Sequence, residues 1–271
     1  MPDTPDSSSL STPRLYSAGL SGKAGLLDET LTVLQLVAQG QGPEELRSSV
    51  LESDVLGKAT HENRRSIWDK LHQRYLADWP NAVRLAKIVA ASSDRNSASL
   101  LIYYEFCRSE PILYDAVTGP VFTRFTTGFS GVEVGDLQTW LDQSEGEHTK
   151  VQRWSPQTRK KVLSNILTVL RDFGLMTGTA RKSFQRIYLP LPVFGYVLYR
   201  LHDTPQLPGP RGIIAAPDWR LFFQDEDDII ALLDEATASG YCTFKRQGEV
   251  MALELSWPDM EAYIEAITGK V

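Results

Sequence analysis

The sequence predicts a mainly α protein with two helical lobes, helix-turn-helix or winged-helix-like units and small β-hairpins. Three observations support this class. Apolar residues recur at helical spacing, as Leu27, Leu31 and Leu34 do near the start. Prolines stand where helices would begin, and glycines stand where they would end. The stretches that suggest strands are short and contain glycine turns, which is typical of hairpins.

Composition indicates a soluble protein. Of the 271 residues, 42% are hydrophobic and 23% are charged, and the net charge is -6. Two cysteines, Cys107 and Cys242, are too few for a disulfide framework and favour a reducing cytoplasm. No stretch approaches the ~18 consecutive apolar residues that a membrane-spanning helix needs, and the first residues do not resemble a signal peptide. We therefore expect a cytoplasmic protein with no membrane partner.

The first third of the chain is predicted to be helical. Residues 1–13 are rich in Pro, Ser and Asp and are expected to be disordered. Residues 14–110 are expected to form an N-terminal helical lobe with a helix-turn-helix-like unit. Gly40 is a natural C-terminal cap, Pro43 a natural first helical residue and Thr60 a natural N-cap. The predicted helices span 23–39, 43–52, 60–76, 81–92 and 96–108.

Residues 111–203 are predicted to form a winged-helix-like basic lobe. A whole or broken helix over 112–125 and a helix over 134–143 come first. The next helix has Ser155 as its N-cap, Pro156 at its first position and Gly174 just past its end. The stretch KSFQRIYLPL follows a glycine turn and suggests a hairpin. Three helices followed by a hairpin is the order of a winged helix.

The remaining chain is predicted to be a linker and an acidic module. Residues 204–216 are rich in proline and suggest a linker. Residues 217–271 suggest a helix-hairpin-helix module, with a helix over 225–239, a hairpin over 241–256 and a closing helix over 257–267.

Charge is distributed unevenly along the chain. From Lys150 to Arg200 there are ten Lys or Arg residues and one acid, Asp172. From Asp218 to Glu265 there are twelve acids and three bases. A polyanion would therefore meet the middle of the molecule first. A fold in which the acidic module covers this basic surface remains an alternative.

The helix that starts at Ser155 has a polar face suited to a DNA major groove. Cations on such a face reach phosphates, and short polar side chains allow close approach to base edges. Cations in a first helical turn oppose the helix dipole, so their presence indicates a binding role. Arg159 lies nearer the apolar side, and the following hairpin would act as a wing along the DNA backbone. The predicted contacts are Arg159, Lys160, Lys161, Ser164, Asn165, Thr168, Arg181, Lys182 and Arg186.

The helix that starts near Thr60 is predicted to be a second DNA anchor. Its cap, two cations and apolar stripe have the same spacing as those after Ser155, although any amphipathic helix with a basic first turn would match. The predicted contacts are Lys58, Arg64, Arg65 and Lys70. A surface salt-bridge network is the alternative for these cations. For the helix after Ser155 the alternatives are a solvated face and docking onto an acidic protein surface.

Catalytic motifs are not found in the sequence. The stretch GLSGKAGLL lacks the glycine at Ser17 and the hydroxyl at Ala24 that a phosphate-binding loop requires. The histidines have no paired-ligand spacing, and the two cysteines form no CxxC motif. No nucleophile elbow is present. We therefore expect a protein that is not an enzyme and uses no metal or cofactor.

Residues 16–76 resemble the BrxA family of BREX (bacteriophage exclusion) phage-defence systems. The resemblance rests on the Tyr-Ser start, the first long helix, the P-E-E-L-R turn and the R-R-x-I-W-x-x-L-x-x-R-Y helix. It implies a mostly helical, two-lobed protein without enzymatic activity that binds double-stranded DNA. It also implies other BREX proteins, a methyltransferase and ATPases, as partners. An assembly adaptor and an RNA-binding protein are the alternative functions.

Overall fold

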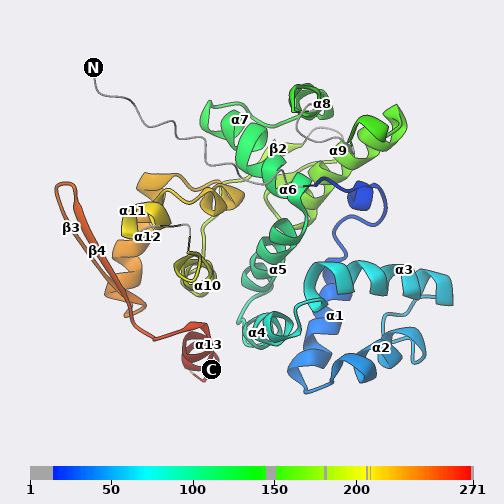
Figure 1. Ribbon diagram of the computed structural model, residues 1–271, viewed down its shortest axis with the longest axis horizontal. Helices are drawn as coiled ribbons and strands as arrows, with labels where there is room; N and C mark the ends of the chain where they lie inside the picture. The colour runs from blue at the N-terminus through cyan, green and yellow to red at the C-terminus, as the bar shows by residue number, and fades with distance from the viewer. Residues whose placement is uncertain (1–14, 145–150, 180–181, 206, 208, 270–271) are drawn as a thin grey trace.

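The structure, a computed structural model, describes residues 15–144, 151–179, 182–205, 207 and 209–269. Helices dominate these ranges, and the strands within them form two antiparallel hairpins (Figure 1). The predicted mainly α class with small hairpins is therefore confirmed. The predicted disordered tail, residues 1–13, lies outside the described residues.

The N-terminal helices follow the predicted order. They are η1 (Ala18–Ser21), α1 (Leu27–Ala38), α2 (Pro43–Leu51), α3 (His61–Leu71), its π-helical continuation η2 (His72–Leu76), α4 (Trp79–Ala90) and α5 (Arg95–Ser109). Thr60 caps α3 as expected, because its side chain accepts a hydrogen bond from the Asn63 N–H. Asp78 and Asp94 cap α4 and α5 in the same way.

The middle of the chain contains a broken helix and then the helix-hairpin unit. The elements are α6 (Pro111–Ala116), the π-helical η3 (Val117–Val121), α7 (Phe122–Thr126), α8 (Val134–Gln143), η5 (Val151–Arg153), α9 (Pro156–Asp172), β1 (Met176–Thr177) and β2 (Ser183–Phe184). Pro120 lies within η3 and accounts for the break. Ser155 caps α9 and Gly174 ends it at a φ of 82°, as predicted.

Helix α10 (Leu191–His202) is missing from the sequence-based prediction. Residues 193–199 are all buried, so α10 has no polar stripe along that stretch. The predicted hairpin KSFQRIYLPL runs into the start of α10, where Pro190 and Pro192 occupy the N-cap and the first turn, positions at which proline is tolerated. The predicted linker also contains a helix, α11 (Gly209–Ile214), followed by η6 (Pro217–Phe222).

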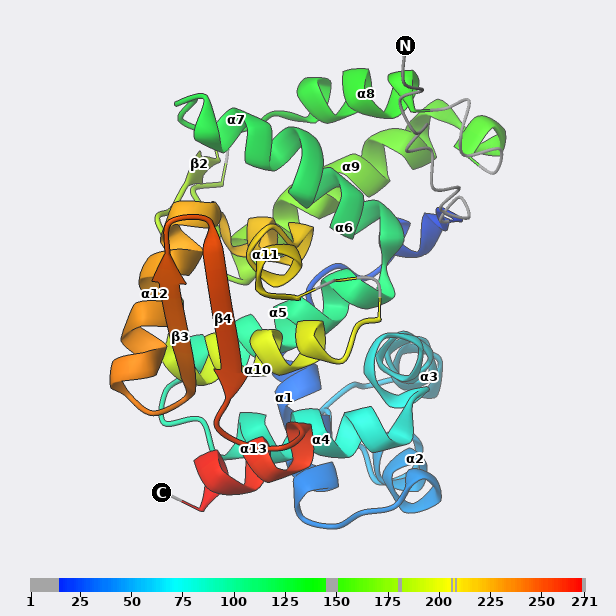
Figure 2. The ribbon, with the colours of Figure 1, turned by 60° about the vertical axis from the view of Figure 1, so that its left-hand side comes forward.

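The C-terminal elements are packed into the rest of the molecule. They are α12 (Glu226–Ala238), β3 (Cys242–Gln247), β4 (Val250–Leu255) and α13 (Met260–Thr268). Figure 2 shows the β3–β4 hairpin lying over α12 and α11, while α13 lies beside α4 and α10. The buried apolar residues form one continuous cluster from Tyr16 to Ile264, which crosses the predicted boundaries after residues 110, 203 and 216.

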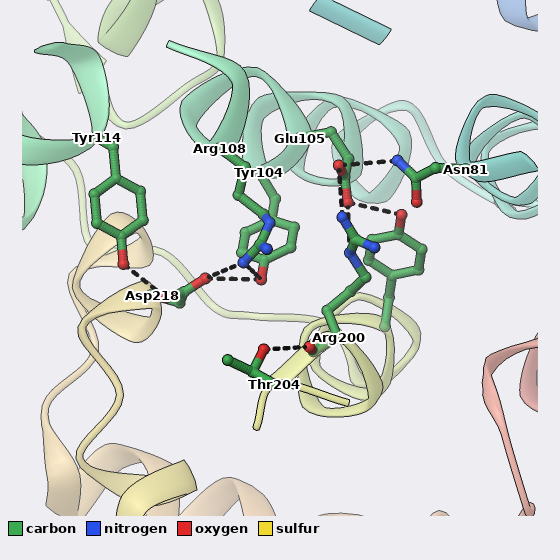
Figure 3. Close-up of polar contacts among 9 residues, drawn as sticks. Asn81, Tyr104, Glu105, Arg108, Tyr114, Arg200, Thr204 and Asp218 are labelled. Atoms are coloured by element: carbon green, nitrogen blue, oxygen red, sulfur yellow. Dashed lines mark hydrogen bonds and ion pairs between the residues drawn. The ribbon is translucent and has the colours of Figure 1, made fainter. Parts of the chain in front are cut away.

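Asp218 joins the start of the predicted acidic module to α5 and α6 (Figure 3). Its buried carboxylate accepts hydrogen bonds from the hydroxyls of Tyr104 at 2.8 Å and Tyr114 at 2.7 Å. The Arg108 guanidinium lies 3.0 Å from the same carboxylate. Burial raises the pKa of the Tyr104 hydroxyl, so this group remains a proton donor.

A second buried carboxylate, Glu105, connects α5 to α4 and α10 (Figure 3). It accepts hydrogen bonds from Asn81 at 3.1 Å and Tyr196 at 2.9 Å. The Arg200 guanidinium approaches the carboxylate to 3.1 Å. Removing one partner from such a buried network leaves the others without hydrogen bonds, so the network favours one arrangement of these helices.

Candidate nucleic-acid interface

The first turns of α9 present cations to solvent. Lys160 and Lys161 are exposed and pair with no other residue that the structure describes. Ser155 caps the helix through a 3.1 Å hydrogen bond from the Thr158 N–H, and no acid stands in the first turn to balance the charge. The orientation predicted for these two lysines is therefore found.

Asn165, predicted to face outward on α9, is instead buried with 8% of its surface exposed. Its side-chain amide donates hydrogen bonds to the backbone carbonyls of Leu20 and, at 3.2 Å, Gly22. The prediction that Asn165 faces DNA is wrong, because residues 16–25, hereafter the N-terminal strap, cover this part of the helix. The helical pattern placed Asn165 on the polar face but gave no sign of the strap.

The strap is anchored between α9 and the end of α3. Figure 1 shows its blue η1 turn between these two helices. Arg74 donates hydrogen bonds to the carbonyls of Ala24 at 2.7 Å and Lys23 at 2.8 Å. Tyr16 bonds to Asp115 at 2.9 Å. Because the Tyr16 hydroxyl anchors one end and Arg74 holds the backbone of the other, the strap is a fixed part of the fold.

The other polar residues of α9 are partly enclosed. Ser164 and Thr168 are half-buried, and the Thr168 hydroxyl donates to the Ser164 carbonyl at 3.1 Å. Arg159 forms an ion pair with Asp142 at 3.3 Å and donates to the Val151 carbonyl at 3.2 Å. Arg159 therefore holds α9 against α8 and η5, and the accessible part of the helix is its N-terminal end.

A hairpin, β1–β2, lies where the wing was predicted, and it is called the wing below. Met176 pairs with Phe184 in the hairpin. Lys182 is half-buried and Arg186 is exposed. Burial, and to a smaller extent the neighbouring Arg171 cation, lower the pKa of Lys182, while Asp172 partly offsets them. Arg181 lies outside the described residues.

The acidic α12 approaches the wing at Arg186. A groove of about 880 Å³ has Arg186 on one side and Asp225 and Asp228 on the other. Tyr188, just after the wing, donates a 2.7 Å hydrogen bond to Glu235 of α12. The acidic module therefore reaches the base of the basic surface at this point.

The cations predicted as a second anchor are mostly engaged within the fold. Lys58 pairs with Glu29 at 2.8 Å. Arg64 donates to the carbonyls of Leu51 at 2.9 Å and Lys58 at 3.1 Å, so it closes the loop before α3. Arg65 is exposed and pairs with no residue in the described ranges.

Lys70, the last of the predicted second-anchor cations, is half-buried at the strap. A Cβ placed on Gly19 would lie 3.5 Å from the Lys70 ammonium. The Lys70 charge also offsets a small part of the rise that burial causes in the pKa of Glu110. Of the four cations predicted as a second anchor, Arg65 is therefore the accessible one.

One further exposed cation, Arg153, was missed by the sequence analysis. It ends η5, two residues before the cap of α9, and has no partner in the described part of the chain. The basic tract from 150 to 200 contained this signal, but a helix-face analysis cannot place a residue that precedes the helix. Arg153, Lys160 and Lys161 together form the cationic end of α9.

The described residues carry no cluster of three or more His, Cys, Asp or Glu side chains able to hold a metal ion. Within the same ranges, no helix is both long and apolar enough to span a bilayer.

Comparisons with known proteins identify one family and one solved fold. The family model described as BrxA matches residues 14–198, more than half of the chain. A crystal structure of an uncharacterized protein from Magnetospirillum magneticum is similar, with a TM-score of 0.60 and 16% sequence identity. That match covers 75% of this chain and 98% of the other, and it concerns the fold alone. No curated protein matches the chain.

Proposed function

The chain belongs to the BrxA family and is thus a component of a BREX phage-defence system, in which we propose that it binds double-stranded DNA. The proposed role is non-enzymatic and cytoplasmic, and other BREX proteins are its expected protein partners. Double-stranded DNA is the expected ligand of the cationic end of α9 and of the wing.

The observation that carries this proposal is the pair of exposed lysines at the N-terminal end of α9. Lys160 and Lys161 have no carboxylate partner among the described residues. Backbone phosphates would supply the missing negative charge.

The geometry of α9 limits how it can contact a duplex. The strap over Asn165 prevents the whole helix from lying in a groove. In helix-turn-helix proteins the N-terminal residues of the recognition helix make the base and phosphate contacts, and this end of α9 is uncovered. Contact through its end, with Lys182 and Arg186 of the wing on the backbone, fits these constraints.

Binding of this kind is expected to be tolerant of DNA sequence. The accessible groups are mainly Lys and Arg side chains, which contact phosphates, whereas Asn165 is committed to the strap. Arg65 on α3 is available as a second phosphate contact.

A second candidate function is that of an assembly adaptor, favoured by the outer face of the β3–β4 hairpin. Thr243, Lys245, Val250, Ala252 and Glu254 are all exposed there, and Val250 shows 72% of its surface. An exposed apolar residue on a small sheet is a common feature of protein-binding surfaces.

Fluorescence anisotropy with labelled duplexes tests the DNA proposal. The variant K160A/K161A/K182A/R186A should bind duplexes of different sequence more weakly by similar factors. The matched control, K245A/R246A, removes two exposed cations from the hairpin and should bind like the natural protein. Equal affinities for the two variants, or stronger competition by structured RNA than by duplex DNA, would count against the proposal.

A further inference from the structure

Phe129 is an exposed aromatic side chain beside the wing. It lies in the α7–α8 loop, residues 127–133, and shows 53% of its surface. Soluble proteins bury most aromatic surface, so a large exposed ring on a short loop needs an explanation.

The loop holds the Phe129 ring in a defined position. The Arg124 guanidinium lies 4.0 Å from the ring centroid and so stacks on one face of it. The same guanidinium donates to the Gly131 carbonyl at 3.2 Å and pairs with Asp136 at 3.0 Å. Because Arg124 is fixed by these two contacts, the ring that rests on it is oriented before any ligand arrives.

The loop is also joined to the wing. The Phe184 N–H of β2 donates a 2.8 Å hydrogen bond to the Ser130 carbonyl. A Cβ on Gly131 would lie 2.1 Å from the Lys182 carbonyl oxygen, so this position requires glycine. Phe129 is therefore part of one rigid unit with the cations of the wing.

We propose that Phe129 is a wedge that inserts between base pairs of duplex DNA at the step next to the wing. The inference rests on the proposed DNA binding and adds a contact that phosphate binding alone does not supply. Apolar side chains flanked by cations unstack base steps in this way and kink the duplex. Lys182 and Arg186 would hold the backbone on either side of the opened step.

The alternative role for Phe129 is to shield the Arg124–Asp136 ion pair from water. This role predicts a loss of stability when the ring is removed and no effect on DNA structure. The wedge role predicts the reverse, because an exposed side chain contributes little to folding.

Duplexes with 2-aminopurine at one internal position test the inference, since the fluorescence of this base rises when it is unstacked. The natural protein should raise the signal on binding. Phe129→Ala should bind the duplex about fivefold to tenfold more weakly, which is the lower part of the range for stacking on one base. At saturation the variant should give no rise in 2-aminopurine fluorescence. Phe129→Leu keeps an apolar wedge and should retain much of the rise. Val250→Ala, which removes another exposed apolar side chain, is the control and should behave like the natural protein.

The outcomes separate this inference from the proposed function. Saturable binding with no change in 2-aminopurine fluorescence would overturn the wedge and leave DNA binding intact. An undiminished rise with Phe129→Ala, together with a lower melting temperature, would assign Phe129 to the ion pair. No binding at low salt would overturn both the wedge and the proposed function.

Discussion

The side-chain amide of Asn165 donates a hydrogen bond to the backbone carbonyl of Gly22 at 3.2 Å. This contact joins the middle of α9 to the N-terminal strap and separates the helix into a covered body and a free N-terminal end. The residues expected to bind DNA are thereby divided into structural residues, such as Asn165, and accessible ones, such as Lys160.

Asn165→Ala should destabilise the fold without weakening DNA binding. The buried carbonyl of Leu20 and the carbonyl of the exposed Gly22 would lose their donor, at a cost of about 1–3 kcal/mol that comes mainly from Leu20. Urea unfolding measures the loss, and anisotropy at a temperature where the variant is folded measures binding. Lys161→Ala is the matched control and should show the opposite pattern. A folded Asn165→Ala protein with reduced affinity would mean that Asn165 contacts DNA.

Replacement of Lys160 and Lys161 together should lower both the affinity for duplex DNA and its salt dependence. Two fewer phosphate contacts reduce the magnitude of the log–log salt slope by about 1.8. The fold should be unaffected because both side chains are exposed. Anisotropy titrations at several salt concentrations give the slope. An unchanged slope would place the DNA contact elsewhere on the molecule.

Sequence patterns predict the parts of this site that depend on residues close together in the chain. Local signals located α9 correctly, because Ser155, Pro156 and Gly174 act on the backbone next to them. The helical period separated polar from apolar residues, but it cannot reveal that a distant strap covers Asn165. Charge identified Arg64 and Lys58 as cations, while their partners depend on tertiary folding.

The main error in the fold has a similar cause. Helix α10 is buried on nearly all sides, so the polar stripe that identifies surface helices is missing. Its Tyr196 meets Glu105, which lies 91 residues earlier in the chain. Long-range contacts of the same kind, such as that between Asp218 and Tyr104, join the predicted acidic module to the rest of the fold.

Asp218→Ala should destabilise the protein strongly. The change leaves the hydroxyls of Tyr104 and Tyr114 without their acceptor and leaves Arg108 without its ion-pair partner. Because Arg108 is one-third exposed, we expect a cost near the lower end of the range for breaking buried pairs, about 3 kcal/mol. Asp234→Ala, at an exposed position on α12, is the control and should change the unfolding free energy little. Equal stabilities of the two variants in urea would contradict the role given to Asp218.

Glu110→Gln should change how stability depends on pH. Burial raises the folded-state pKa of Glu110, although Ser17, Arg74 and Lys70 offset part of this effect. The folded protein therefore binds more protons than the unfolded chain as pH rises from the ordinary glutamate pKa of about 4.3 through the raised value. In that window the natural protein should lose stability relative to Glu110→Gln, and above it the difference should be constant.

Urea midpoints of both proteins across that window measure the Glu110 effect. Glu52→Gln, at an exposed helix end, is the control and should track the natural protein. A natural protein that gains stability relative to Glu110→Gln as pH rises through the window would contradict the raised pKa.

The central claim is that exposed cations at the end of α9 and on the wing neutralise DNA phosphates. A salt-resolved titration of the natural protein with duplex DNA tests it most directly. With roughly six phosphates neutralised, log K should fall linearly with log salt at a slope near -5. An affinity that does not change with salt, or an absence of binding at low salt, would contradict the claim.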